Sequence, residues 1–194
     1  IKNSKELASL INYTNLNNII TESEMKEFLN KAKEMNFNSV VVSPTYVSLA
    51  KEILEGTDIK VGSVIGFPLG FEDTESKIAS AKSLNEKGVD EFEVVLNISY
   101  LKDEKYDLLE NEIRQIKEVI GDKILKVVIE TKALEDYEKA NAAKVAENSG
   151  ADYVKTSTGF STGGATVEAV KPMRKTVGDR LGVKASGGIR DKET

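Results

Sequence analysis

The stretch "SGADYV", residues 149–154, repeats the pattern of "KGVDEF", residues 87–92. In both, a helical segment ends, a glycine and a small residue follow, and an aspartate precedes a strand-like run. Seven such apolar, β-branched runs alternate with segments of helical periodicity. Strands that alternate with helices pair in parallel through right-handed crossovers, which predicts an α/β fold. The predicted strands lie within residues 7–14, 38–43, 59–67, 89–98, 123–131, 151–157 and 180–186.

Two parallel architectures fit this alternation, a doubly wound sheet and a TIM (β/α)8 barrel. Chemically functional residues gather at the carboxyl ends of several predicted strands, which favours the barrel. Only seven strands are predicted, and the chain stops at "GGIRDKET" (187–194), where the helix after the seventh strand would begin. We therefore expect a single (β/α) barrel domain over residues 1–194 that is incomplete at its C-terminus, without the eighth strand and last helices.

The composition narrows the possible chemistry. The chain has 194 residues, of which 40% are hydrophobic and 30% charged, as expected for one domain with a sizeable core. It contains no histidine and no cysteine, which excludes imidazole bases, thiolate nucleophiles and the usual zinc ligands. An enzyme of this composition would depend on lysine, carboxylate, hydroxyl and backbone groups.

The charge pattern and hydropathy indicate the cellular setting. No run of eighteen apolar residues and no signal peptide are found, so we expect no membrane partner and a cytoplasmic location. A net charge of −5 without a basic cluster argues against nucleic acid as a partner.

Two lysines are the first candidates for catalysis. Lys155 shares a strand face with Tyr153, and Lys184 lies on the corresponding face of the next strand, with Lys126 a candidate to join them. Two ammonium groups about 6 Å apart repel by roughly 3 kcal/mol, or about 2 pKa units, at an effective dielectric of ~20. Burial lowers a lysine pKa as well, so one amine could be neutral and attack a carbonyl. The alternative is that each lysine ends a strand and reaches solvent.

Glycine-rich loops follow the same two strands, as "STGFSTGG" (157–164) and "SGGIR" (186–190). Successive backbone N–H groups in such loops can bind a phosphate, and Arg190 could add a charged contact. The alternative is a pair of tight turns between strand and helix. Glu93, in the fourth predicted strand, is expected to point inward because Phe92 and Val94 suit packing under helices.

The block "ADYVKTSTGFSTGGATVEAVKPMRKTVGDRLGVKASGGIR" (151–190) resembles the signature region of deoxyribose-phosphate aldolase. The segments "SVIGFPLG", "LKVVIET" and "VSPTYV" match this family too. The resemblance implies a class I aldolase on a TIM barrel that uses no metal and no cofactor, a lyase of deoxyribonucleotide catabolism. Such an enzyme reversibly cleaves 2-deoxy-D-ribose 5-phosphate to acetaldehyde and D-glyceraldehyde 3-phosphate through a lysine Schiff base.

The resemblance also implies residue roles. Lys155 would form the Schiff base, Lys184 would lower its pKa, and Glu93 would take part in proton transfer, where the family has an aspartate. A small phosphosugar is the implied partner and a homodimer the implied assembly. The implied substrate and phosphate contacts are Thr158, Gly159, Gly187, Gly188 and Arg190.

A second function remains open at this point. Glu93 replaces the family's aspartate, and "NYT" (Asn12–Thr14) stands where the family has "DHT". These two departures, together with the expected missing C-terminal end, make a catalytically weakened or inactive phosphosugar-binding barrel the alternative.

Overall fold

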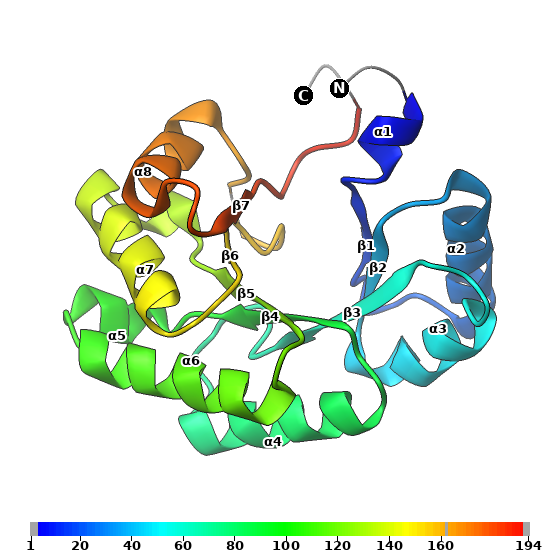
Figure 1. Ribbon diagram of the computed structural model, residues 1–194, viewed down its shortest axis with the longest axis horizontal. Helices are drawn as coiled ribbons and strands as arrows, with labels where there is room; N and C mark the ends of the chain where they lie inside the picture. The colour runs from blue at the N-terminus through cyan, green and yellow to red at the C-terminus, as the bar shows by residue number, and fades with distance from the viewer. Residues whose placement is uncertain (1–3, 162, 192–194) are drawn as a thin grey trace. The chain divides into compact units, whose positions relative to one another are not determined.

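The computed structural model describes residues 4–161 and 163–191, with side chains from residue 6 onward. Its strands form a seven-stranded sheet in chain order, so the predicted parallel α/β alternation is confirmed (Figure 1). The strands in these residues are β1 (Asn12–Asn15), β2 (Ser39–Val42), β3 (Lys60–Ile65), β4 (Glu91–Val95), β5 (Ile124–Val128), β6 (Tyr153–Lys155) and β7 (Gly182–Lys184).

Helices connect these strands. The α-helices in the described part of the chain are α1 (Ser4–Ala8), α2 (Glu22–Met35), α3 (Val47–Ile53), α4 (Thr74–Glu86), α5 (Ile98–Lys102), α6 (Tyr106–Ile120), α7 (Asp136–Asn148) and α8 (Val167–Val177). Short 3-10 helices cover Pro44–Tyr46 and Thr131–Ala133. None of the described helices is long and apolar enough to span a membrane.

The prediction of one strand over residues 7–14 is wrong in its first half. Helix α1 reaches Ala8, and the N–H groups of Leu10 and Ile11 bond back to Leu7 and Ala8 at 3.0 Å. These turn bonds use the backbone groups that a strand would offer to its neighbour. Pairing with β2 therefore begins only at Asn12, which aligns with Ser39.

The chain divides into two compact units, and the single-domain expectation stays a prediction. The first unit comprises the described residues up to Val64 together with residues 83–92. Helix α2 starts with the capping box expected of Thr21 and Glu24, since each side chain accepts the other's backbone N–H. Tyr13 of β1 stacks on Phe28 of α2 with ring centroids 4.3 Å apart, so this helix packs directly against the first strand.

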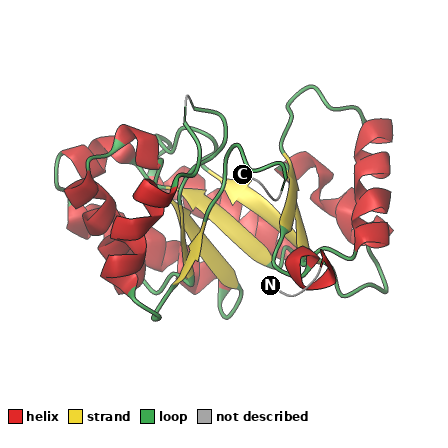
Figure 2. Ribbon diagram, turned by 90° about the horizontal axis from the view of Figure 1, so that it is seen from above, coloured by secondary structure: helices red, strands yellow, loops and turns green. Residues whose placement is uncertain are grey.

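The second unit comprises residues 65–82 and the described residues from Glu93 onward. Strands β5, β6 and β7 align in rows, with Lys126 beside Tyr153 and Gly182 in one row. Two residues further along each strand, Val128, Lys155 and Lys184 form the next row on the same face. Helices α7 and α8 lie side by side and contact β6 and β7 respectively (Figure 1). Figure 2 shows strands in yellow with helices in red alongside them, so the lysine row lies on a sheet supported by helices.

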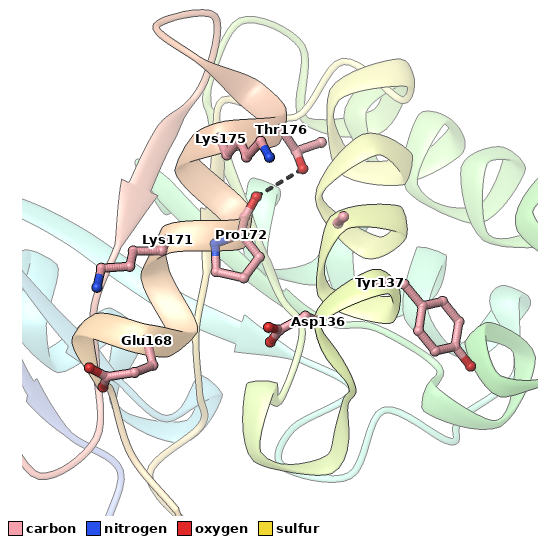
Figure 3. Close-up of a pocket in the computed structure, with 8 residues that line it drawn as sticks. Asp136, Tyr137, Glu168, Lys171, Pro172, Lys175 and Thr176 are labelled. Carbon is pink, nitrogen blue, oxygen red and sulfur yellow. Dashed lines mark hydrogen bonds between the residues drawn. The ribbon is translucent and has the colours of Figure 1, made fainter.

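Helix α8 contains a proline in its interior, Pro172. Its ring nitrogen has no hydrogen to donate to the carbonyl of Glu168, four residues earlier. An open groove between α7 and α8 lies over this position, and Thr176 donates a hydrogen bond of 2.8 Å to the carbonyl of Pro172 (Figure 3). The groove is lined by Asp136, Tyr137, Ala140, Glu168, Lys171, Pro172, Lys175 and Thr176.

Replacing Pro172 should stabilise the protein. Pro172→Ala returns an N–H donor to α8, and we expect the free energy of unfolding to rise by about 1–2 kcal/mol after the greater entropy of the unfolded variant is counted. Urea unfolding of both proteins measures this change. Lys175→Ala, an exposed change in the same helix, is the control and should stay within about 0.5 kcal/mol. A Pro172→Ala variant that unfolds at the same or a lower urea concentration contradicts the helix-defect interpretation.

Candidate active site

The centre of the candidate site is the carboxylate of Glu93 in β4. Its side chain is fully buried, and its two oxygens each bond a different lysine. Oε2 lies 2.5 Å from Nζ of Lys155, and Oε1 lies 2.6 Å from Nζ of Lys184. The inward orientation predicted for Glu93 is therefore confirmed. One carboxylate joins three strands, β4, β6 and β7.

The strand register brings the two lysines to this carboxylate. Lys155 and Lys184 are direct partners in the β6–β7 pair, so their side chains leave neighbouring strands on one face. The side chain of Lys155 is 3% exposed and that of Lys184 is 16% exposed. The alternative in which each lysine reaches bulk solvent is wrong, because both amines turn inward to the carboxylate.

Burial and charge act against each other at Glu93. Burial alone raises the pKa of a carboxyl group, but the ammonium groups of Lys155, Lys184 and Lys126 hold the pKa of Glu93 well below its usual range. Glu93 is therefore ionised at every pH at which the protein would work. The sequence placed two lysines side by side but did not predict that a carboxylate would bond to both.

At Lys184 the combined effect of burial and neighbouring charges favours the neutral amine. The pKa of Lys184 is lowered to about 8: burial lowers it most, the carboxylate of Glu93 raises it, and the charges of Lys155 and Lys126 lower it again. An amine with a pKa of about 8 exchanges protons readily near neutral pH. Lys184 is thus suited to accept and return a proton.

Lys126 lies one row from the lysine pair and is 2% exposed. Its Nζ lies 5.6 Å from the centroid of the Tyr153 ring, a cation–π contact. The Tyr153 ring occupies the space over Gly182, where an added Cβ would lie 2.1 Å from a ring carbon. Only glycine at position 182 leaves room for this ring. The candidate third lysine is therefore part of the same buried charge group.

The two glycine loops lie against each other beside the lysines. Gly159, Gly187 and Gly188 have φ angles of 85°, 84° and 82°, in the region that favours glycine. The N–H of Ala165 donates to the carbonyl of Gly187 at 3.1 Å, and Ser186 Oγ donates to the carbonyl of Ser157 at 2.6 Å. The structure thus brings the predicted glycines of both loops together.

Thr158 and Arg190 have different surroundings. Thr158 is buried, and its backbone N–H donates to the carboxylate of Glu130, whereas Arg190 is exposed. Sequence reasoning missed Glu130, although the carboxylate directly after the apolar run of "LKVVIET" was a usable signal. The hydroxyls of Thr131 and Ser157 are buried and have no hydrogen-bond partner among the described residues. The loops after β5 and β6 therefore present two polar groups that remain open to a water or a ligand.

Within residues 4–161 and 163–191, no cluster of three or more carboxylates has the arrangement needed to hold a metal ion.

Comparison with known proteins agrees with this architecture. A family model described as "DeoC/LacD family aldolase" matches residues 8–194. Deoxyribose-phosphate aldolase of Streptococcus gordonii is 50% identical over 185 residues, which cover 95% of this chain and 84% of that protein. The enzyme of the same name from Caldanaerobacter subterraneus is 47% identical over 190 residues, covering 96% of this chain and 82% of that one.

Solved structures give the same result. The deoxyribose phosphate aldolase of Aeropyrum pernix, described as a tetramer, superposes with a TM-score of 0.89 at 30% identity. That match covers 98% of this chain and 81% of the other. An aldolase called QR15 superposes with a TM-score of 0.93 at 37% identity, covering 97% of this chain and 84% of that chain.

The fold and these relatives define an enzyme class, the aldolases built on a TIM-type α/β barrel. The chain belongs to the DeoC/LacD family of aldolases. The predicted fold class is confirmed, with seven barrel strands in the described residues. The predicted resemblance to deoxyribose-phosphate aldolase is confirmed as well.

Removing the charge of Glu93 should destabilise the protein. Glu93→Gln leaves two buried amines without their counter-charge, so we expect a loss of roughly 3–5 kcal/mol in the free energy of unfolding at pH 7. Because the pKa of Glu93 is lowered on folding, its stabilising effect is complete above the unfolded-state value of 4.5 and is lost as pH falls below it.

Urea unfolding of wild type and Glu93→Gln from pH 7 down to pH 3 measures this dependence. The difference between the two proteins should shrink as the solution becomes more acidic. A difference that is absent at pH 7, or that grows on acidification, contradicts the ion-pair assignment.

Proposed function

We propose that this chain reversibly cleaves 2-deoxy-D-ribose 5-phosphate to acetaldehyde and D-glyceraldehyde 3-phosphate through a Schiff base on Lys155. The single observation that supports this best is the buried carboxylate of Glu93 bonded to both Lys155 and Lys184. The names of the relatives support the substrate, and the paired glycine loops beside the lysines fit a phosphate group.

Lys155 is the better nucleophile candidate of the two. It lies deeper than Lys184, so an adduct on its nitrogen would be shielded from water. The free amine of Lys155 adds to the aldehyde carbon of the open-chain sugar, and loss of water gives an iminium. The proton that Lys155 gives up can pass to Lys184, whose pKa of about 8 leaves part of its population able to accept it.

The iminium then acts as an electron sink. Removal of the proton from the C3 hydroxyl breaks the C2–C3 bond, which releases D-glyceraldehyde 3-phosphate and leaves an enamine on Lys155. Protonation of the enamine carbon and addition of water release acetaldehyde and restore the amine. Glu93 remains ionised throughout, so it can stabilise the positive charge on either nitrogen.

The phosphate is assigned to the two glycine loops. Gly159, Gly187 and Gly188 adopt positive φ angles, and loops of this kind can direct backbone N–H groups toward an anion. Arg190 is exposed on the second loop, and its guanidinium group would add a charge-assisted contact to the bound phosphate. Thr158 would contribute its hydroxyl, because its N–H is already bonded to Glu130.

A non-catalytic phosphosugar-binding barrel is the less favoured function. The extra methylene of Glu93 is one reason to consider it, yet this side chain reaches both amines. Asn12 is another reason, and it has hydrogen bonds to Ser39 and Glu91 within the first unit. A homodimer and a cytoplasmic location stay predictions.

Reductive trapping tests the proposal. Incubation with acetaldehyde and borohydride should ethylate Lys155, because hydride reduces the iminium to a stable secondary amine. Peptide mass spectrometry locates the adduct, and a coupled assay follows cleavage of 2-deoxyribose 5-phosphate. Lys155→Met should lose both adduct and turnover, whereas the exposed control Lys171→Met should keep them.

Two outcomes would contradict the proposal. Turnover by Lys155→Met would exclude a Schiff base at this lysine. Binding of 2-deoxyribose 5-phosphate to wild type without turnover or adduct would favour the non-catalytic barrel.

A further inference from the structure

Another buried ion pair, between a lysine and a glutamate, lies outside the candidate active site. Lys77 of α4 is fully buried, and its Nζ lies 2.7 Å from Oε1 of Glu112 in α6. The other oxygen of Glu112 accepts a hydrogen bond of 2.8 Å from Thr74. The proposed mechanism uses none of these groups.

The amine of Lys77 also reaches the strand that holds Glu93. Nζ donates a hydrogen bond of 3.1 Å to the carbonyl of Val95, the last residue of β4. Val95 lies two residues beyond Glu93, so both side chains extend from the same strand face. The ammonium group therefore fixes the carboxyl end of β4 within reach of the catalytic carboxylate.

The stem of Lys77 supports the loop that follows β3. Gly66 has a φ of +63°, and a Cβ added there would lie 2.9 Å from Cε of Lys77. The N–H of Gly70 closes the loop with a 2.7 Å hydrogen bond to the carbonyl of Gly66. A Cβ added at Gly70 would lie 2.3 Å from the carbonyl oxygen of Leu96. The loop over residues 66–70 thus rests on both the lysine and the end of β4.

This loop in turn contacts the glycine loop after β6. The ring of Phe67 meets the ring of Phe160 edge to face, with centroids 5.3 Å apart. Phe160 directly follows Gly159, one of the proposed phosphate contacts. A chain of direct contacts therefore runs from Lys77 to the end of β4 on one side and to the glycine loop on the other.

Stability alone is a weak reason for such a pair. A buried ion pair is often no more stabilising than well-packed apolar side chains of similar volume, whereas it can define one geometry through directed hydrogen bonds. Glu112 holds the amine of Lys77, and Lys77 directs a hydrogen bond at the end of β4, where a shift of about 1 Å can reduce catalysis on the order of a hundredfold.

We propose that Lys77 and Glu112 are positioning residues that hold Glu93 and the 66–70 loop in the geometry needed for catalysis. This inference rests on the proposed aldolase function for its effect on rate. Its structural part, the restraint of the end of β4, can be measured without any activity.

The test replaces both charges at once, as Lys77→Met with Glu112→Leu, so that no unpaired charge remains buried. We expect a folded protein whose melting temperature stays within about 5 °C of wild type. Hydrogen exchange at the Leu96 and Gly70 amides should accelerate about tenfold. The kcat should fall by about 10- to 100-fold, with KM changed less than about threefold.

Two further variants keep the test decisive. Gly66→Ala displaces the stem of Lys77 and strains the backbone of the 66–70 loop without changing any charge, and it should show the same exchange and kcat pattern if the double variant does not fold. Lys102→Met removes a part-exposed ion pair with Glu138 in the same unit, and it should change neither the two exchange rates nor kcat.

Wild-type exchange at both amides in a folded double variant, or in Gly66→Ala, overturns the restraint of β4. Faster exchange with unchanged kcat overturns the catalytic role of the pair. If wild type itself shows no aldol cleavage, the proposed function fails, and the exchange rates still decide whether Lys77 and Glu112 fix the strand.

Discussion

One carboxylate shared by two buried amines is the interaction on which the site depends. Transferring a charged carboxylate from water into a protein interior costs several kcal/mol, and a partner charge offsets this cost only with good geometry. Glu93 has that geometry twice, with contacts of 2.5 Å and 2.6 Å to Lys155 and Lys184. Lys126 lies close enough to act on both Glu93 and Lys184. A site of this kind keeps one carboxylate ionised and brings one amine close to neutrality.

The backbone explains how these groups meet. Parallel strands place residues in rows, and the row of Val128, Lys155 and Lys184 brings both lysines to one face. The neighbouring row places the Tyr153 ring over Gly182, which leaves Lys126 buried beneath an aromatic face. In barrels of this class, the loops after the strands hold the functional groups. The glycine loops after β6 and β7 follow that rule.

Much of this could be predicted from the sequence, because its signals are local. The two-residue period of a strand places Lys155 and Lys184 on corresponding faces of neighbouring strands, and the apolar neighbours of Glu93 indicate that its side chain points inward. The capping box at Thr21 and the glycine–aspartate pattern before β4 and β6 likewise depend only on neighbouring residues. Resemblance to a family with a specific signature then assigned roles that spacing alone could not.

The parts that could not be predicted depend on contacts between distant segments. No local pattern shows that Glu93 bonds two lysines 62 and 91 positions away, or that Lys77 is buried against Glu112 and the end of β4. The left-handed backbone of Glu130, with a φ of 51°, is another feature that the sequence does not indicate. The first predicted strand failed for a local reason, since a short helix and its closing turn compete for the same backbone groups.

The most direct test of the shared carboxylate is a pH titration of Lys184 by nuclear magnetic resonance, with carbon-13 label at its Cε. In wild type the midpoint should lie near pH 8. In Glu93→Gln, recorded under conditions in which the variant stays folded, the midpoint should fall below that value. The reason is that burial and the charges of Lys155 and Lys126 would then act without opposition. A midpoint close to the 10.5 of an ordinary lysine in wild type, or one that stays the same or rises in the variant, would contradict the shared-carboxylate site.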